Sequence, residues 1–125
     1  MNEWRRFVRS VGYACTGIVH TWKTQRNMQI HVIAAILVLF CTWWLQIPRG
    51  DVLLVFFSIA LVISLELVNT AVEAAVDLIT EETHPLAKIA KDASAGAVLV
   101  AAVISVVIGL AVFGPPLLAM LKKQL

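Results

Sequence analysis

The residues best suited to chemistry lie in one short stretch of this 125-residue chain, at a spacing typical of one helix face. At about 100° per residue, positions 0, +3, +4, +7 and +11 of this stretch fall within a sector of about 100°. We call this set the polar stripe; it comprises Glu66, Asn69, Thr70, Glu73 and Asp77.

The residue types of the polar stripe suit two jobs at different depths of a membrane. A carboxylate that a lipid head group can reach, such as Glu66, could act as a general base. Carboxylates nearer the cytoplasm, Glu73 and Asp77, could hold Mg²⁺ together with phosphate oxygens. Together these jobs suit phosphoryl transfer to a lipid hydroxyl. The alternative is that the polar groups hold helices together, and for Thr70 that reading stays open.

The composition around the polar stripe is that of a membrane protein. Hydrophobic residues make up 60% of the chain and charged residues 14%, with a formal net charge of +2. Soluble domains are about 45–50% apolar and about 25% charged. These values exclude a disordered chain, a nucleic-acid-binding domain and an ordinary cytosolic enzyme. We predict a single all-α membrane domain over residues 1–125.

Charge-free runs locate three spanning helices. The run between Arg26 and Arg49 and the run between Asp92 and Lys122 both exceed the roughly 20 residues that cross a bilayer. The middle run, 52–65, is too short, so its helix must include the polar stripe. We predict a turn at 48–51 and a helix end at 114–116, where Gly-Pro-Pro occurs. The predicted spans are therefore about 27–47, 52–79 and 85–113.

Charge distribution predicts the orientation in the membrane. The first 26 residues carry five bases, and Lys88 and Lys91 lie in the second predicted loop. By the positive-inside rule, the N-terminus and the 80–92 loop are cytoplasmic.

Residues 3–24 have the pattern of a basic amphipathic helix that lies in the membrane interface. The opposite, polar face carries Arg6 and Tyr13. This polar face is either exposed to solvent without a further role, or it covers an active site. The apolar face consists of Trp4, Phe7, Val8, Val11, Cys15, Ile18, Val19 and Trp22.

The third span begins with a charged segment and continues with small residues. Lys91 and Asp92 could bind phosphate and nucleotide or metal, or could be a solvated charge cluster. Walker A, kinase Gly-rich and G-x-G-x-x-G motifs are missing from the sequence, which excludes the standard nucleotide-binding folds. A stripe of small residues at every fourth position favours close helix packing: Ala93, Ala97, Ala101, Ser105 and Gly109.

Three segments together resemble one known family. The runs ELVNTAVEAAVDLI and HPLAKIAKDASAGAVLV are similar to the small bacterial membrane diacylglycerol kinases, and RNMQIH to their undecaprenol kinase branch. The resemblance covers about residues 6–113. It implies a homotrimer in the bacterial plasma membrane, each subunit having three spans and a surface helix, with sites shared between subunits. It also implies ATP and Mg²⁺ as co-substrate and cofactor, and a membrane lipid alcohol as substrate.

The resemblance also implies roles for individual residues. Glu66 would be the general base, and Asn69 would help to position that base. Glu73 would bind the metal ion and the nucleotide phosphates. The remaining nucleotide contacts implied on this chain are Arg6, Tyr13, Asp77, Glu82, Thr83, His84, Lys91 and Asp92.

One position departs from the family pattern, which usually reads E-R-N-x-x-I-H. This chain has Gln25 where the family has a second metal-ligating Glu. A neutral carbonyl oxygen is a weaker Mg²⁺ ligand than a carboxylate, so metal affinity should fall.

We therefore expect an ATP-dependent lipid kinase acting on undecaprenol. The same chemistry on diacylglycerol is the first alternative, because apolar residues around a lipid distinguish the two poorly. A small proton-coupled exporter with a membrane-embedded Glu is a more distant one.

Overall fold

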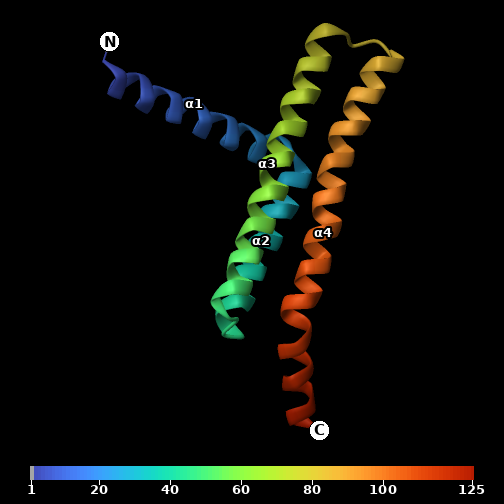
Figure 1. Ribbon diagram of the computed structural model, residues 1–125. Coiled ribbons are helices and arrows are strands. Elements are labelled where there is room, and N and C mark those ends of the chain that lie inside the picture. Colours follow the sequence, from blue (N-terminus) through green and yellow to red (C-terminus); the bar gives the residue numbers. More distant parts are fainter. Residues whose placement is uncertain (1) are drawn as a thin grey trace.

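The computed structural model describes residues 2–125 and contains four helices and no strand in that range (Figure 1). This confirms the predicted all-α class. Three of the helices are long and apolar enough to cross a membrane, so the chain is a multi-pass membrane protein. The helices are α1 (Glu3–Thr24), α2 (Arg26–Trp44), α3 (Arg49–Ile79) and α4 (Pro85–Gln124).

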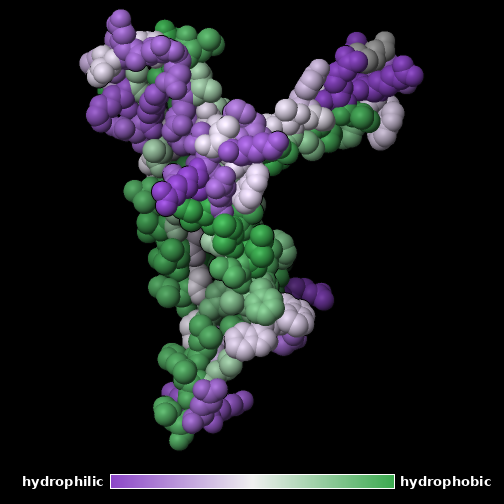
Figure 2. All heavy atoms as spheres, turned by 180° about the vertical axis from the view of Figure 1, so that it is seen from behind, coloured by the Kyte–Doolittle hydropathy of each residue, from purple (hydrophilic) through white to green (hydrophobic). Residues whose placement is uncertain are grey.

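Helix α3 is the centre of the bundle, since both α2 and α4 pack against it. Outside these contacts, long apolar side chains are exposed along all three helices; Leu110 and Phe57 are more than 60% exposed. Figure 2 shows this surface as a hydrophobic band with most polar residues gathered at one end and a smaller polar group near the other. Lipid covers such a band, and the helical backbone satisfies its own hydrogen bonds there.

The three spanning helices differ greatly in length. At about 1.5 Å per residue, the 19 residues of α2 cover about 28 Å, close to the roughly 30 Å hydrocarbon thickness. The 31 residues of α3 cover about 46 Å and the 40 residues of α4 about 60 Å. In Figure 1 the loop-connected ends of α3 and α4 therefore extend past the start of α2. This projecting pair of helix ends carries the later part of the polar stripe.

The turn between α2 and α3 differs from the prediction of residues 48–51. Helix α2 ends at Trp44, and Gln46 adopts a left-handed backbone with φ 53°. The Ile47 N–H donates to the Thr42 carbonyl (3.2 Å) and the Gln46 N–H to the Trp43 carbonyl (3.2 Å), a Schellman arrangement. Ile47 is then buried, so its side chain stabilises the turn.

The residues that follow this turn belong to α3. Pro48, with φ −57°, is the N-cap, and residues 49–51 form the first helical turn. Asp51 lies in that turn, where a negative charge favours the helix dipole. The predicted position of the turn, residues 48–51, was therefore wrong. The connection between the two helices lies about one helical turn earlier in the chain.

The predicted end of the last helix at residues 114–116 was also wrong. Helix α4 continues through Pro115 and Pro116 to Gln124. Proline removes one backbone hydrogen bond but has a φ compatible with a helix, so a kink can replace a break. Figure 1 shows α4 changing direction in its C-terminal third.

The stripe of small residues, which is predicted to favour close helix packing, is only partly buried within the chain. Of its members, Ala93 and Ala97 are exposed, Ser105 and Gly109 are half-buried, and Ala101 is buried. A strict four-residue repeat rotates about 40° around the helix at each step, because four residues turn about 400°. The buried and half-buried residues of α4 that face the bundle instead recur at alternating steps of three and four residues.

Helix α1 leaves the bundle at a wide angle and contacts α2 and α3 near its C-terminal end (Figure 1). Its N-cap is Asn2, whose side chain accepts from the Arg5 N–H at 2.9 Å. In Figure 2 its polar residues lie along one side, and its apolar residues face the hydrophobic band of the bundle. This arrangement is that of an interfacial helix, with the bounds 3–24 that the sequence predicts.

We expect Ala101→Leu to destabilise the fold. Ala101 is 2% exposed, and α4 packs against α3. Extra methylenes in a tight contact cost about 1–3 kcal/mol in the free energy of unfolding. Thermal unfolding in detergent, monitored by circular dichroism, measures the change. Val100→Leu, at a position that is 59% exposed, is the control and should unfold like the parent protein.

Candidate functional site

The polar stripe runs along α3 from the buried interior of the bundle to its exposed end. Glu66 is 1% exposed and Asn69 is 7% exposed, while the Asp77 side chain is 59% exposed. Eleven residues of helix separate the two ends, a rise of about 17 Å. The stripe therefore joins an apolar environment to an aqueous one.

Glu66 is the most deeply buried ionisable group of the site. Its Oε2 atom has no hydrogen-bond partner among the described residues. The nearest basic group is His31 on α2, whose Nε2 atom lies 3.9 Å from Glu66 Oε2. An unpaired carboxylate oxygen is costly in an apolar interior, so it indicates a functional requirement rather than a packing one.

Asn69 connects the two long helices. Its Oδ1 atom accepts from the Ser94 hydroxyl of α4 at 2.6 Å, and its Nδ2 atom donates to Glu73 Oε1 at 3.3 Å. The second hydrogen bond fixes the half-buried Glu73 one turn further along α3. Asn69 thereby holds α4 and the Glu73 carboxylate in a defined relation.

Thr70 does not connect helices. Its hydroxyl donates to the Glu66 carbonyl at 3.0 Å, one turn back on its own helix. The reading of Thr70 as an interhelical contact is therefore not supported within the chain.

The exposed end of the site is a group of ion pairs. Lys91 Nζ on α4 lies 2.6 Å from Asp77 Oδ1 on α3, which joins the two helix ends. Asp92 pairs instead with Lys88, one turn earlier on its own helix. Both pairs are solvent-exposed, and such pairs contribute at most about 1 kcal/mol to stability. Their charges therefore remain available for a ligand.

The loop between α3 and α4 closes this end around a polar hollow of about 280 Å³. His84 caps α4, because its Nδ1 atom accepts from the Leu86 N–H at 3.1 Å. Pro85 then occupies the first helical turn, where its missing N–H is not needed. The hollow brings together these polar residues predicted for the nucleotide: Asp77, Glu82, Thr83, His84, Lys91 and Asp92.

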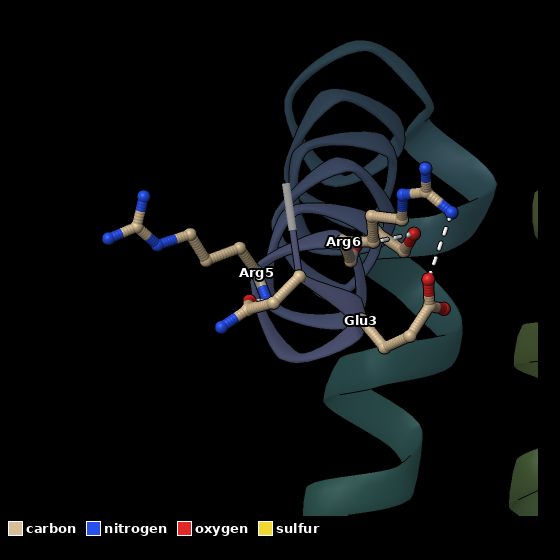
Figure 3. A network of polar contacts seen from close by, with 5 residues as sticks. Glu3, Arg5 and Arg6 are labelled. Atoms are coloured by element: carbon tan, nitrogen blue, oxygen red, sulfur yellow. Dashed lines mark hydrogen bonds and ion pairs between the residues drawn. The ribbon is translucent and has the colours of Figure 1, made fainter.

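Two predicted nucleotide contacts lie away from this hollow. Arg6 and Tyr13 are on the exposed polar face of α1, which projects from the bundle (Figure 1). Arg6 Nη1 donates to Glu3 Oε1 at 2.9 Å, and Arg5 points to the other side of the helix (Figure 3). Within one chain, therefore, α1 does not bring these side chains to the polar stripe.

Comparison with known proteins supports one family. The family profile described as prokaryotic diacylglycerol kinase matches residues 12–113. The chain belongs to the prokaryotic diacylglycerol kinase family. It is 50% identical to the undecaprenol kinase of Bacillus subtilis over 93% of this chain and 94% of that protein.

More distant members of the family carry a different name. The chain is 39% identical to the diacylglycerol kinase of Synechocystis over 96% of its own length and 71% of that protein. Identity to the Escherichia coli K12 diacylglycerol kinase is 31%, over 82% and 84% of the two chains. The chain is therefore an enzyme of a lipid kinase family, which uses ATP as phosphate donor. The exporter alternative is excluded.

Gln25, which stands at the expected metal-ligand position, lies at the junction of α1 and α2. Its extended backbone (φ −110°, ψ 113°) separates the two helices, and its N–H donates to the Thr21 carbonyl at 2.9 Å. Across residues 2–125, no three acidic, His or Cys side chains cluster closely enough to hold a metal ion. Mg²⁺ often needs only one or two carboxylates when phosphates and water complete its shell.

The sequence analysis did not predict two residues of the site, Ser94 and His31. Ser94 was unmarked because serine is common in membrane helices, and its partner lies 25 residues away. His31 is the last polar residue before the long apolar run of α2, which was an available signal. Its approach to Glu66 depends on the register between α2 and α3, which the sequence does not specify.

We expect Ser94→Ala to weaken the α3–α4 contact. The substitution removes the donor to Asn69 Oδ1, and a hydrogen bond of this kind contributes about 1 kcal/mol. Chemical or thermal unfolding in detergent measures the loss. The matched control is Ser105→Ala, because the Ser105 hydroxyl bonds only a carbonyl of its own helix. Equal stability of the two variants would show that the Ser94–Asn69 bond carries no net stabilisation.

Proposed function

We propose that this protein is an ATP-dependent undecaprenol kinase that forms undecaprenyl phosphate, with residues 1–125 acting as one domain. The acceptor is proposed from the 50% identity to an undecaprenol kinase over nearly the whole of both chains. One structural observation carries the mechanism: the acids of α3 pass from buried to exposed within about three turns. A lipid hydroxyl and a soluble nucleotide require those two environments.

Glu66 is proposed as the general base at the lipid end. Its free Oε2 atom can accept the proton of the lipid hydroxyl, whose oxygen then bonds to the γ-phosphorus. The bond from that phosphorus to the bridging oxygen breaks, and ADP leaves. Asn69 restrains the neighbouring backbone and Glu73 through its two hydrogen bonds. Positioning and charge neutralisation supply most of the catalysis in such a transfer.

The exposed end is proposed to bind the nucleotide. Lys91 presents a compact positive charge for phosphate, and Asp77 and Asp92 keep the lysines of α4 oriented through their ion pairs. Glu82, Thr83 and His84 offer polar groups around the 280 Å³ hollow. Glu73 and Gln25 would hold Mg²⁺, which neutralises phosphate charge when bound.

A homotrimer is proposed to complete the site. Arg6 and Tyr13 are proposed nucleotide contacts, yet α1 carries them away from the hollow of their own chain. A neighbouring subunit can receive them, and its helices can cover part of the apolar surface. The proposed orientation, in a bacterial plasma membrane, puts the N-terminus and the α3–α4 loop in the cytoplasm, where ATP is available.

Diacylglycerol is the second candidate acceptor. The observation in its favour is the name of the relatives at 39% and 31% identity. Either lipid would present a primary hydroxyl to the same Glu66 carboxylate, so the chemistry is unchanged. ATP consumption by the purified protein with undecaprenol, with diacylglycerol and with neither lipid separates the two. Equal or greater turnover of diacylglycerol would overturn the undecaprenol assignment.

We expect Glu66→Gln to abolish turnover while the fold and ATP binding persist. The amide keeps the size of the side chain but cannot accept the hydroxyl proton, and general-base catalysis contributes about 10²–10⁴-fold. Lipid phosphorylation and nucleotide binding are measured on the same preparation. Asp51→Asn, the same change at the other end of α3, is the control. Near-normal turnover of Glu66→Gln would contradict the role of Glu66 as base.

We expect Gln25→Glu to lower the Mg²⁺ concentration needed for half-maximal activity. A carboxylate at this junction would add a charged oxygen to the ligands proposed for the metal, and Mg²⁺ prefers such oxygens. Titration of activity with Mg²⁺ measures the shift. Gln124→Glu makes the same charge change at the far end of α4 and serves as control. An unchanged Mg²⁺ dependence would remove Gln25 from the proposed metal site.

A further inference from the structure

The free oxygen of Glu66 has one basic neighbour that the proposed mechanism does not use. His31 Nε2 lies 3.9 Å from Glu66 Oε2, an ion-pair distance that is longer than a hydrogen bond. The His31 side chain is 22% exposed, whereas that of Glu66 is 2% exposed. His31 is therefore the more accessible member of this pair.

His31 also borders a largely apolar cavity. An open cavity of about 370 Å³ lies between α2, α3 and α4, and His31 is the one ionisable residue in its wall. Glu66 does not line this cavity. His31 therefore borders the cavity and also lies at ion-pair distance from the carboxylate.

We propose that His31 is a positioning residue for Glu66. A movement of about 1 Å brings the Nε2–H of the imidazole within hydrogen-bond distance of Oε2. That contact holds the carboxylate in one orientation until the lipid hydroxyl replaces the imidazole as the donor to Oε2. His31 keeps its own proton throughout, and the hydroxyl proton still passes to Glu66. This inference rests on the proposed function, because it concerns the same carboxylate.

Physical chemistry favours a histidine for this task. An imidazole N–H is a directed donor that need not be charged, so it can satisfy a buried carboxylate without a permanent second ion. A lysine or arginine in this apolar wall would add a permanent charge within the bilayer. The imidazole is also short and planar, with few rotatable bonds to be ordered.

Three variants of His31 separate positioning from packing. Leu removes the donor but fills similar space. Gln keeps an N–H at about the reach of Nε2, whereas the shorter Asn keeps an amide that cannot reach as far. Ser105→Ala, also in the cavity wall, is the matched control because its hydroxyl bonds its own helix.

The experiment measures kcat, the KM for ATP and thermal unfolding of each variant with the lipid alcohol that the parent enzyme phosphorylates. We expect His31→Leu and His31→Asn to lose about 100-fold in kcat, with the KM for ATP nearly unchanged, because a small misplacement of a catalytic group costs that much. We expect His31→Gln to recover about tenfold or more of that loss. Ser105→Ala should match the parent.

Two results would overturn the role of His31. One is parental kcat in His31→Leu; the other is equal kcat in His31→Gln and His31→Asn, both of which keep a polar group in the wall. If His31→Leu does not fold, the comparison of Gln with Asn still decides. Failure of the proposed function has a different signature, since the parent protein itself would then phosphorylate no lipid alcohol.

Discussion

A carboxyl group enclosed by apolar helices is the constraint on which the rest of this structure depends. Glu66 is almost completely buried, and one of its oxygens has no hydrogen-bond partner in the described chain. Such a group costs several kcal/mol unless something offsets it. The packing of α3 against both α2 and α4 offsets that cost, and the hydrogen bonds of Asn69 continue the polar path toward water.

The extension of α3 and α4 past the start of α2 is related to the same constraint. A helix that only crossed the membrane, like α2, would end close to the level of Glu66. Helices α3 and α4 extend together beyond that level, and the Asp77–Lys91 pair joins their ends. The exposed extension supplies charged groups that the bilayer would not tolerate, while the apolar part supplies the lipid environment. Helices α3 and α4 form both the exposed part and the apolar part of the site.

Much of this arrangement could be predicted from periodicity and charge. The three spans, the surface helix and the placement of Glu66 and Asp77 on one face follow from residue spacing alone. The end of α2 could not be predicted, because Gln46 occupies a left-handed position that the sequence does not mark with glycine. The continuation of α4 through Pro115 was missed because two prolines usually stop a helix. His31 and Ser94 depend on helix register, which is a property of packing.

The change from buried to exposed acids also bears on how the proposed kinase would avoid wasting ATP. Water competes with any alcohol for an activated phosphoryl group, and exclusion of water is the usual protection. If the base were at the exposed end beside Lys91, it could activate water as readily as a lipid hydroxyl. A base placed about 17 Å away along α3, buried in the apolar part of the bundle, meets an acceptor that arrives from the bilayer. The terminal phosphate must then reach the base, so transfer occurs at the boundary between the two environments.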